Sequence, residues 1–289
     1  MDINQLHYFL KIVEHGNFTR AAEDCGISQP AISQQVAKLE EELGQPVLER
    51  QGRRVTLTQA GEVLFYRAEK ILQLVDDAKS QITDDGQTGR LTISAIPTLA
   101  PYLLPVVIKK FREQSPGAHV IINEDTTDVL VKRCSQGEID LGLLALPIDT
   151  KYLETEELFD EELLLLVPKE HPLAATQNPD VSGIKTEPFL LLNETHCLSN
   201  NVTIFCEQNA FHPVALGRVS QLTTIQTLVG LGQGISLIPA LAAQTDVSDE
   251  RVYLSLRERP TRTIVVCWNP YRFQSKLCKK FLECLREVT

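Results

Sequence analysis

Apolar residues near the N-terminus recur at helical spacing in two short segments that are separated by a glycine. Asn17 can cap a first helix over residues 18–25, because its side chain accepts hydrogen bonds from the free backbone amides of the first turn. Gly26 ends that segment, since glycine adopts positive φ without steric cost. Ser28 can cap a second helix over residues 30–43, with a proline in its first turn. The pattern predicts a helix-turn-helix.

The second of these helices carries a polar face opposite its apolar one, and a basic turn follows it. Glutamine can read adenine edges in a major groove, and lysine can read guanine or phosphate. Three arginines crowd a glycine-containing turn before residues 55–58, which predicts a wing that touches backbone phosphates. The alternative is a small helical subdomain with an ordinary polar surface. The candidate DNA-binding residues are Gln29, Pro30, Ser33, Gln34, Lys38, Arg50, Arg53 and Arg54.

The segment over residues 17–61 reads NFTRAAEDCGISQPAISQQVAKLEEELGQPVLERQGRRVTLTQAG. It resembles the N-terminal winged helix-turn-helix of the LysR-type transcriptional regulators, and the resemblance extends more loosely over all 289 residues. Leu48 stands where that family usually has a phenylalanine, and a leucine can fill the same pocket with some loss of packing. The resemblance implies a sequence-specific DNA-binding regulator.

A single long helix is predicted from Thr58 to about Ile82, because no glycine or proline follows Gly61 within it. Apolar residues recur along this segment at alternating intervals of four and three, which is a heptad seam. The seam predicts pairing with the same helix of a second subunit, and the alternative is burial against its own domain. The candidate dimerisation residues are Leu64, Ala68, Ile71, Val75, Ala78 and Ile82. Residues 84–89 read as a short hinge.

Beyond Arg90 the pattern changes to strands that alternate with helices, which predicts an α/β fold with largely parallel sheets. The resemblance implies two Rossmann-like lobes of the periplasmic-binding-protein type, with crossings near residues 159–162 and 262–265 and a cleft between the lobes. The expected domains are 1–58 (winged helix-turn-helix), 59–89 (dimerisation helix and hinge) and 90–289 (effector domain). Within the last, lobe I takes 90–161 and 266–289, and lobe II takes 162–265. Strands are expected at 91–96, 119–123, 139–144, 162–167, 188–192, 215–219, 235–238 and 262–268.

A glycine string at Gly230, Gly232 and Gly234 has the spacing of a dinucleotide-binding loop. It lies between a predicted helix and a predicted strand, which is the reverse of the strand-to-helix order that a phosphate cradle needs. We therefore interpret it as a helix end and a tight turn.

The net charge of −10 argues against a general nucleic-acid binder, and residues 1–59 alone carry six basic and eight acidic residues. DNA reading then depends on local placement, with Asp24 and the acidic run 40–42 facing away from the duplex, and on a dimer with two recognition helices. No apolar run approaches the length of about 20 residues that a membrane span needs. The N-terminus does not read as a signal peptide, so a cytoplasmic protein is expected.

Seven cysteines, an odd number in a chain of this kind, do not suggest a structural disulfide framework. No Cys/His cluster has metal-ligand spacing, so neither zinc nor another cofactor is expected. Cys197 differs from the rest because it lies near a predicted helix N-terminus, directly after His196. Both features favour the thiolate, which is the species that attacks peroxide. The other cysteines, apart from Cys206, read as packing residues.

Cys206 follows Cys197 by nine residues of predicted helix. That length turns through about 900° and rises roughly 13 Å, which places the two thiols on opposite faces. A disulfide tolerates only about 4.4–6.8 Å between Cα atoms. If these two cysteines bond, the helix between them must unwind and the surrounding lobe must repack.

The effector half also resembles the OxyR-type hydrogen-peroxide regulators. Its matches are Ile96-Pro97-Thr98, Thr127, His196-Cys197-Leu198, Cys206 and Arg262. The resemblance implies that Cys197 is the peroxidatic cysteine and forms a disulfide with Cys206. It implies that Thr98, Thr127 and His196 position peroxide, while Arg262 matches a basic residue near the final strand. The run Ser199-Asn200-Asn201 departs from the usual Arg-Asp-Gln of these regulators.

Three other functions remain open at this level. A LysR-type regulator can instead respond to a small organic anion in the interlobe cleft, with Thr98 at a helix start as the carboxylate contact. A thiol peroxidase shares the cysteine chemistry but has no use for a winged helix, so the chain is not expected to be an enzyme. A solute-binding protein of a transporter is disfavoured because no signal peptide is evident. The expected partners are double-stranded operator DNA with two-fold symmetry, a second copy in a homodimer or homotetramer, RNA polymerase, and peroxide or a small effector, with no membrane.

Overall fold

The computed structural model describes residues 1–51, 54–148 and 152–289. The chain forms two compact units, Met1–Thr83 and Asp84–Thr289. The expected hinge over 84–89 is in part a strand, because β3 already begins at Thr88.

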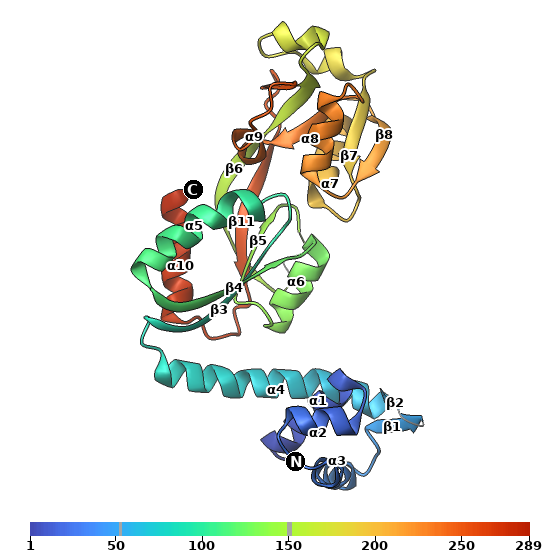
Figure 1. Cartoon of the computed structure of the whole chain (residues 1–289), viewed down its shortest axis with the longest axis vertical. Coiled ribbons are helices and arrows are strands. Elements are labelled where there is room, and N and C mark those ends of the chain that lie inside the picture. The colour runs from blue at the N-terminus through green and yellow to red at the C-terminus, as the bar shows by residue number, and fades with distance from the viewer. Residues whose placement is uncertain (52–53, 149–151) are drawn as a thin grey trace. The chain divides into compact units, whose positions relative to one another are not determined.

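The first unit is a winged helix-turn-helix (Figure 1). Both expected caps are present: the Asn17 side chain accepts from the backbone amides of Thr19 and Arg20, and that of Ser28 accepts from Ala31. Their helices converge on one apolar core that also holds Leu48, so leucine does fill the pocket. The elements are α1 (Ile3–His15), α2 (Phe18–Asp24), α3 (Gln29–Leu43), β1 (Leu48–Gln51), β2 (Arg54–Leu57) and α4 (Gln59–Thr83).

The residues of the predicted heptad seam along α4 lie in two different environments. Leu64 and Ala68 are buried in the core of their own unit, and Ile71 packs against that core. These residues therefore follow the alternative of burial within one domain. The later seam position Ile82 is 85% exposed. The α4 backbone starts close to the wing, since a Cβ on Gly61 would lie 2.0 Å from the Val47 carbonyl oxygen. Dimerisation through the C-terminal half of α4 stays a prediction.

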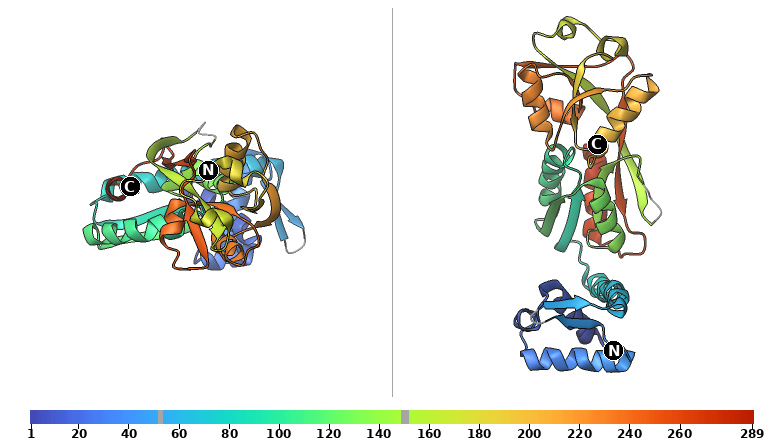
Figure 2. Two further views of the ribbon diagram at one scale, coloured as in Figure 1. Left: turned by 90° about the horizontal axis from the view of Figure 1, so that it is seen from above. Right: turned by 90° about the vertical axis from the view of Figure 1, so that its right-hand side faces the viewer.

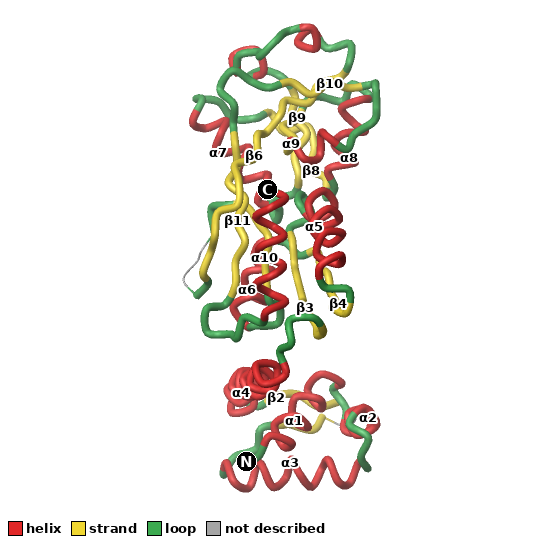
Figure 3. Tube along the Cα trace, turned by 90° about the vertical axis from the view of Figure 1, so that its left-hand side faces the viewer, coloured by secondary structure: helices red, strands yellow, loops and turns green. Residues whose placement is uncertain are grey.

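Lobe I of the second unit is a mixed sheet covered on both faces (Figures 1 and 3). Strand β3 pairs in parallel with β4 and β5, whereas β11 runs antiparallel to β5. Helices α5 and α10 pack against each other through a T-shaped pair of Phe111 and Phe281. The elements are β3 (Thr88–Ala95), α5 (Ala100–Gln114), β4 (Gly117–Glu124), α6 (Thr127–Gln136), β5 (Leu141–Ala145), β11 (Thr261–Trp268) and α10 (Lys276–Val288).

Lobe II packs two small groups of strands around a second apolar core. Strands β7 and β8 pair in parallel, and β9 and β10 both pair antiparallel with β6. The glycine string lies between α8 and β9 as a helix end and turn, which confirms that interpretation. The elements are β6 (Glu154–Pro168), short helical turns η1 (Pro172–Ala175) and η2 (Val181–Ile184), β7 (Pro188–Leu192), α7 (Cys197–Gln208), β8 (Val214–Val219), α8 (Leu222–Gly230), β9 (Ser236–Pro239), α9 (Ala240–Gln244) and β10 (Arg251–Leu254).

Strands β6 and β11 connect the two lobes (Figure 2). The first half of β6 pairs with β11 in lobe I, and its second half, from Leu163, pairs with β9 in lobe II. The predicted crossing near 159–162 therefore agrees with the structure. The predicted end of lobe II at residue 265 is wrong, because Ile264 and Val265 pair with β5 and belong to the core of lobe I. The expectation of largely parallel sheets beyond Arg90 is also wrong, since the strand pairs described in the second unit are four antiparallel and three parallel.

No helix among the described residues combines the length and the apolar character that crossing a membrane requires.

Candidate functional site

The recognition helix α3 exposes Pro30, Gln34 and Lys38, while Gln29 and Ser33 are partly buried at its start. Glu41 is exposed as well and follows Gln34 by seven residues, which places it on the same face. The expectation that the acidic run faces away is therefore wrong for Glu41. Helix-turn-helix proteins insert the N-terminal half of this helix toward the bases, and DNA reading by that half of α3 stays a prediction.

Two other acidic residues of this unit have partners within the protein. A carboxylate oxygen of Glu40 accepts hydrogen bonds from the backbone amides of Val47 and Leu48, so it fixes the entry to the wing. Asp24 lies 2.9 Å from Lys11 Nζ and 3.1 Å from the His15 ring. Of the wing arginines, Arg53 lies outside the described residues. Their part in DNA binding stays a prediction.

Helix α7 carries both predicted redox cysteines and begins at Cys197, one residue earlier than expected. Its thiol therefore lies at the first helical position, where the backbone dipole stabilises an anion. Cys197 is partly exposed and packs against the core of lobe I. Cys206 is fully buried in the core of lobe II, where burial and the neighbouring Glu207 raise its pKa to about 12. The two thiols thus occupy different faces of an intact helix.

A hollow of about 480 Å³ between the lobes opens beside Cys197. Thr127, the first residue of α6, lines it from lobe I. The hydroxyl oxygen of Thr127 is buried, and no described residue hydrogen-bonds to it. Arg218 lines the same hollow and forms a 3.0 Å ion pair with Glu194. The hollow therefore combines a partly exposed thiol with a threonine whose buried hydroxyl has no described partner and an arginine paired with a carboxylate.

His196 and Thr98 line a second hollow of about 240 Å³, together with Tyr102 and Glu124. His196 is 9% exposed, and burial lowers its pKa. Burial therefore disfavours an imidazolium charge beside Cys197, which leaves hydrogen bonding as the way in which His196 can support the thiolate. The sequence-predicted site is divided over two hollows, with Cys197 and Thr127 in one and His196 and Thr98 in the other.

Arg262 is fully buried where the two lobes meet, and its guanidinium is held from both sides. It donates to both Thr98 oxygens, the hydroxyl at 2.8 Å and the carbonyl at 3.1 Å. It also donates two hydrogen bonds to Glu161 Oε2, at 2.9 and 2.7 Å. The other carboxylate oxygen of Glu161 accepts from the backbone amide of Leu241 at the start of α9. Arg262 therefore positions Thr98 and neutralises Glu161.

Glu161 is the functional candidate that sequence reasoning missed. It stands in the charged run Glu154–Glu162, where nothing distinguishes it from its neighbours. The sequence offers one indication of its role: Arg262 lies in a predicted buried strand, and a buried arginine requires a carboxylate partner. Glu161 bonds to residues of both lobes, so it ties the crossing strands to the site.

Four of the remaining cysteines are buried packing residues, as predicted, and Cys25 is partly exposed. The sulfurs of Cys134 and Cys267 lie 3.9 Å apart in the core of lobe I. Contact with Cys267 and burial raise the pKa of the Cys134 thiol, which disfavours its reactive thiolate form.

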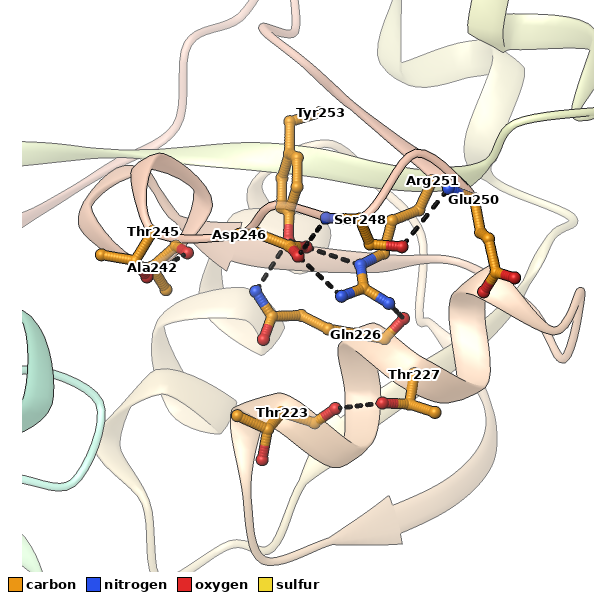
Figure 4. Close-up of polar contacts among 10 residues, drawn as sticks. All are labelled: Thr223, Gln226, Thr227, Ala242, Thr245, Asp246, Ser248, Glu250, Arg251 and Tyr253. Atoms are coloured by element: carbon orange, nitrogen blue, oxygen red, sulfur yellow. Dashed lines mark hydrogen bonds and ion pairs between the residues drawn. The ribbon is translucent and has the colours of Figure 1, made fainter.

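A polar cluster on lobe II holds the middle of α8 at Gln226 (Figure 4). Asp246 accepts from the Arg251 guanidinium at 2.5 and 2.7 Å and from the Tyr253 hydroxyl at 2.5 Å. Arg251 and Tyr253 in turn bond to the backbone and the side chain of Gln226. The Arg251 hydrogen bonds lower the pKa of Asp246 to about 2. Because α8 starts at Leu222 in the His196 hollow, this cluster supports one wall of that hollow.

We expect this cluster to make the stability of the second unit depend on acid pH. The folded-state pKa of Asp246 lies below its ordinary value of 3.8, so its stabilisation is present above pH 4 and is lost as the pH falls toward 2. The contribution is roughly 2 kcal/mol. Urea titrations at pH 7 and pH 2 should show that Asp246→Asn destabilises only at the higher pH. Asp249→Asn, at an exposed position of the same loop, is the control. An equal loss at both pH values would contradict this origin.

These features define a class of protein: a DNA-binding winged helix joined to a two-lobed effector unit. Residues 3–62 match the family described as "Bacterial regulatory helix-turn-helix protein, lysR family". Residues 84–289 match the family described as "LysR substrate binding domain". The chain therefore belongs to the LysR family of DNA-binding transcriptional regulators.

Relatives and solved structures narrow the similarity within this family. The chain is 35% identical over 274 residues to the "DNA-binding transcriptional dual regulator OxyR" of Escherichia coli K12, covering 93% of this chain and 90% of that protein. A "Probable hydrogen peroxide-inducible genes activator" of Streptomyces viridosporus is 35% identical over 249 residues, covering 84% and 79%. A full-length OxyR variant of Pseudomonas aeruginosa superimposes with a TM-score of 0.76 at 28% identity, covering 100% and 97%. These relatives are transcriptional regulators, not enzymes.

Proposed function

We propose that this regulator senses hydrogen peroxide through oxidation of Cys197. The observation that carries the proposal is the hollow beside the helix N-terminal thiol of Cys197, which is also lined by Thr127, a residue whose buried hydroxyl has no hydrogen-bond partner among the described residues. The hydroxyl can accept or donate a hydrogen bond to a bound peroxide. Relatives of this chain are named as hydrogen peroxide-inducible activators, and a Corynebacterium glutamicum OxyR mutant has been solved with peroxide bound.

The proposed chemistry has two steps. The Cys197 thiolate attacks one peroxide oxygen, which gives a sulfenic acid at Cys197 and releases hydroxide. The Cys206 thiol then attacks the sulfenic sulfur, so that a disulfide forms and water leaves. Two electrons pass from the two thiols to one peroxide molecule. The second step requires α7 to unwind, because Cys206 lies in the core of lobe II on another face of the helix.

The DNA-binding residues and the oligomeric state belong to the same proposal. The exposed N-terminal half of α3 reads the operator, and the wing arginines contact phosphates. The exposed C-terminal half of α4 supports a dimer, and two dimers form a tetramer on an operator with two-fold symmetry. Unwinding of α7 changes how the effector units associate, which alters contact with RNA polymerase at the promoter. A cytoplasmic location follows from action on operator DNA.

The peroxide proposal is tested by mapping thiols after oxidation. One molar equivalent of hydrogen peroxide is added to the purified, reduced protein, and peptides are analysed by mass spectrometry. We expect a new link between Cys197 and Cys206 and loss of both free thiols. In a separate assay with excess peroxide and a thiol reductant, peroxide consumption should stay near one equivalent per chain, since a peroxidase would continue to turn over. A protein whose thiols all remain free would overturn the proposal.

The alternative is a regulator that responds to a small organic anion. The anion would bind in the second hollow, which is lined by His196 and Thr98. Three features of that hollow oppose an anion. Glu124 contributes a carboxylate to its lining, and the nearby Arg262 is neutralised by Glu161. Thr98 also lies before α5 and already accepts a hydrogen bond from Arg262. Peroxide at Cys197 is therefore the better-supported effector.

A further inference from the structure

Helix α7 lies between the two lobes and presents a different face to each. The apolar residues Leu198, Val202 and Phe205 recur at intervals of four and three and are buried in the core of lobe II. Cys197 packs instead against the core of lobe I. Asn201 follows Cys197 by four residues, which places it on the same face of the helix. The reduced helix is thus attached to lobe I along the line of Cys197 and Asn201.

Asn201 makes a specific bond on that face. Its side-chain amide donates to the backbone carbonyl of Leu146 at 3.0 Å, across the boundary between the lobes. Leu146 directly precedes Pro147, which lines the Cys197 hollow. The amide oxygen of Asn201 is buried as well, and no described residue donates to it. A buried amide in this position is costly unless its donor is satisfied, so the bond to Leu146 holds this turn of α7 in place.

We propose that Asn201 is the positioning residue that holds α7 in its reduced, helical form and so sets how readily the Cys197–Cys206 disulfide forms. This inference rests on the proposed disulfide. Asn201 lies inside the segment that must unwind for Cys206 to attack the sulfenic acid at Cys197. Unwinding breaks the Asn201–Leu146 bond, so the bond opposes the second oxidation step. It has no part in the first step, in which peroxide oxidises Cys197 within the intact helix.

Replacing the donor isolates this effect. In Asn201→Asp a carboxylate of nearly the same shape faces the Leu146 carbonyl and cannot donate to it. Loss of this buried hydrogen bond raises the free energy of the reduced form. The equilibrium constant for disulfide formation should therefore increase about tenfold. Tenfold in the equilibrium constant corresponds to about 30 mV, toward a more negative potential. The new charge also lies near Cys197, so the reference is Asn200→Asp, at an exposed neighbour on the same helix.

The test uses the full chain and two readouts. Equilibration in glutathione buffers, with thiol mapping by mass spectrometry, gives the potential of the Cys197–Cys206 couple without peroxide. Rapid-quench oxidation with a sulfenic acid trap gives the rate of each step separately. Relative to Asn200→Asp, we expect Asn201→Asp to show the tenfold shift and a faster second step with an equal first step. Asn201→Gln keeps an amide donor and should return both values toward those of the parent protein.

The outcomes separate this inference from the proposed function. An equal potential and an equal second step in the two aspartate variants would overturn the role of Asn201 while leaving the disulfide sensor intact. A parent protein that forms no Cys197–Cys206 disulfide in either assay would overturn the proposed function, and the inference with it. If Asn201→Gln behaves like Asn201→Asp, the donor is not what holds the helix, and the inference fails.

Discussion

Cys197→Ser is expected to abolish the response to peroxide while leaving the protein folded and bound to its operator. A serine hydroxyl does not ionise near neutral pH, so neither a sulfenic acid nor a disulfide can form at this position. Transcription from the target promoter should then stay at its uninduced level when peroxide is added. Cys197 is partly exposed, and serine is close to it in size, so operator affinity should change by about twofold at most.

The matched variant for this prediction is Cys206→Ser. It leaves the peroxidatic thiol in place, so one equivalent of peroxide should give a trapped sulfenic acid at Cys197 without a disulfide. Cys134→Ser removes a buried thiol that the proposal does not use, and it should keep the full response. Reporter transcription and operator binding by fluorescence anisotropy measure the two properties separately. Full induction in Cys197→Ser would show that the sensing site lies outside α7.

The DNA-binding half of the fold could be predicted from the sequence because its signals are local. Asn17, Gly26 and Ser28 each mark a helix boundary through their own backbone and side-chain chemistry, and the structure places each boundary accordingly. The heptad seam along α4 was a weaker signal. The heptad spacing is the same at Leu64, which is buried, and at Ile82, which is exposed. Periodicity identifies an apolar stripe but does not show whether the stripe packs against its own domain or against a second subunit.

The effector unit was harder to predict where long-range pairing decides the structure. Strand β6 begins eight residues before the predicted strand, because Glu154–Glu161 is charged and carries no apolar alternation. Its pairing with β11 makes it a strand. That pairing buries Glu161, which the sequence could not distinguish from its acidic neighbours. The division of His196 and Cys197 between two hollows is equally a tertiary property, since adjacent residues at a helix start point in different directions.

Glu161→Gln is expected to have the largest effect on stability. The substitution leaves the fully buried guanidinium of Arg262 without its counter-charge. Removing one partner of a buried ion pair typically lowers the free energy of unfolding by about 3–5 kcal/mol. The loss should also free Thr98, whose hydroxyl and carbonyl oxygens are held by the same guanidinium. The second unit should therefore unfold at lower urea concentration, and its His196 hollow should lose one fixed wall.

The chain provides its own probe and control for this prediction. Trp268, the single tryptophan, lies on β11 with Arg262, so its fluorescence reports unfolding of the second unit. Glu157→Gln makes the same chemical change at an exposed position of β6 and should stay within about 0.5 kcal/mol of the parent protein. Adding Arg262→Met to Glu161→Gln removes the unpaired charge, so it should recover part of the loss. A cost below about 1 kcal/mol for Glu161→Gln would mean that the ion pair does not hold the lobes together.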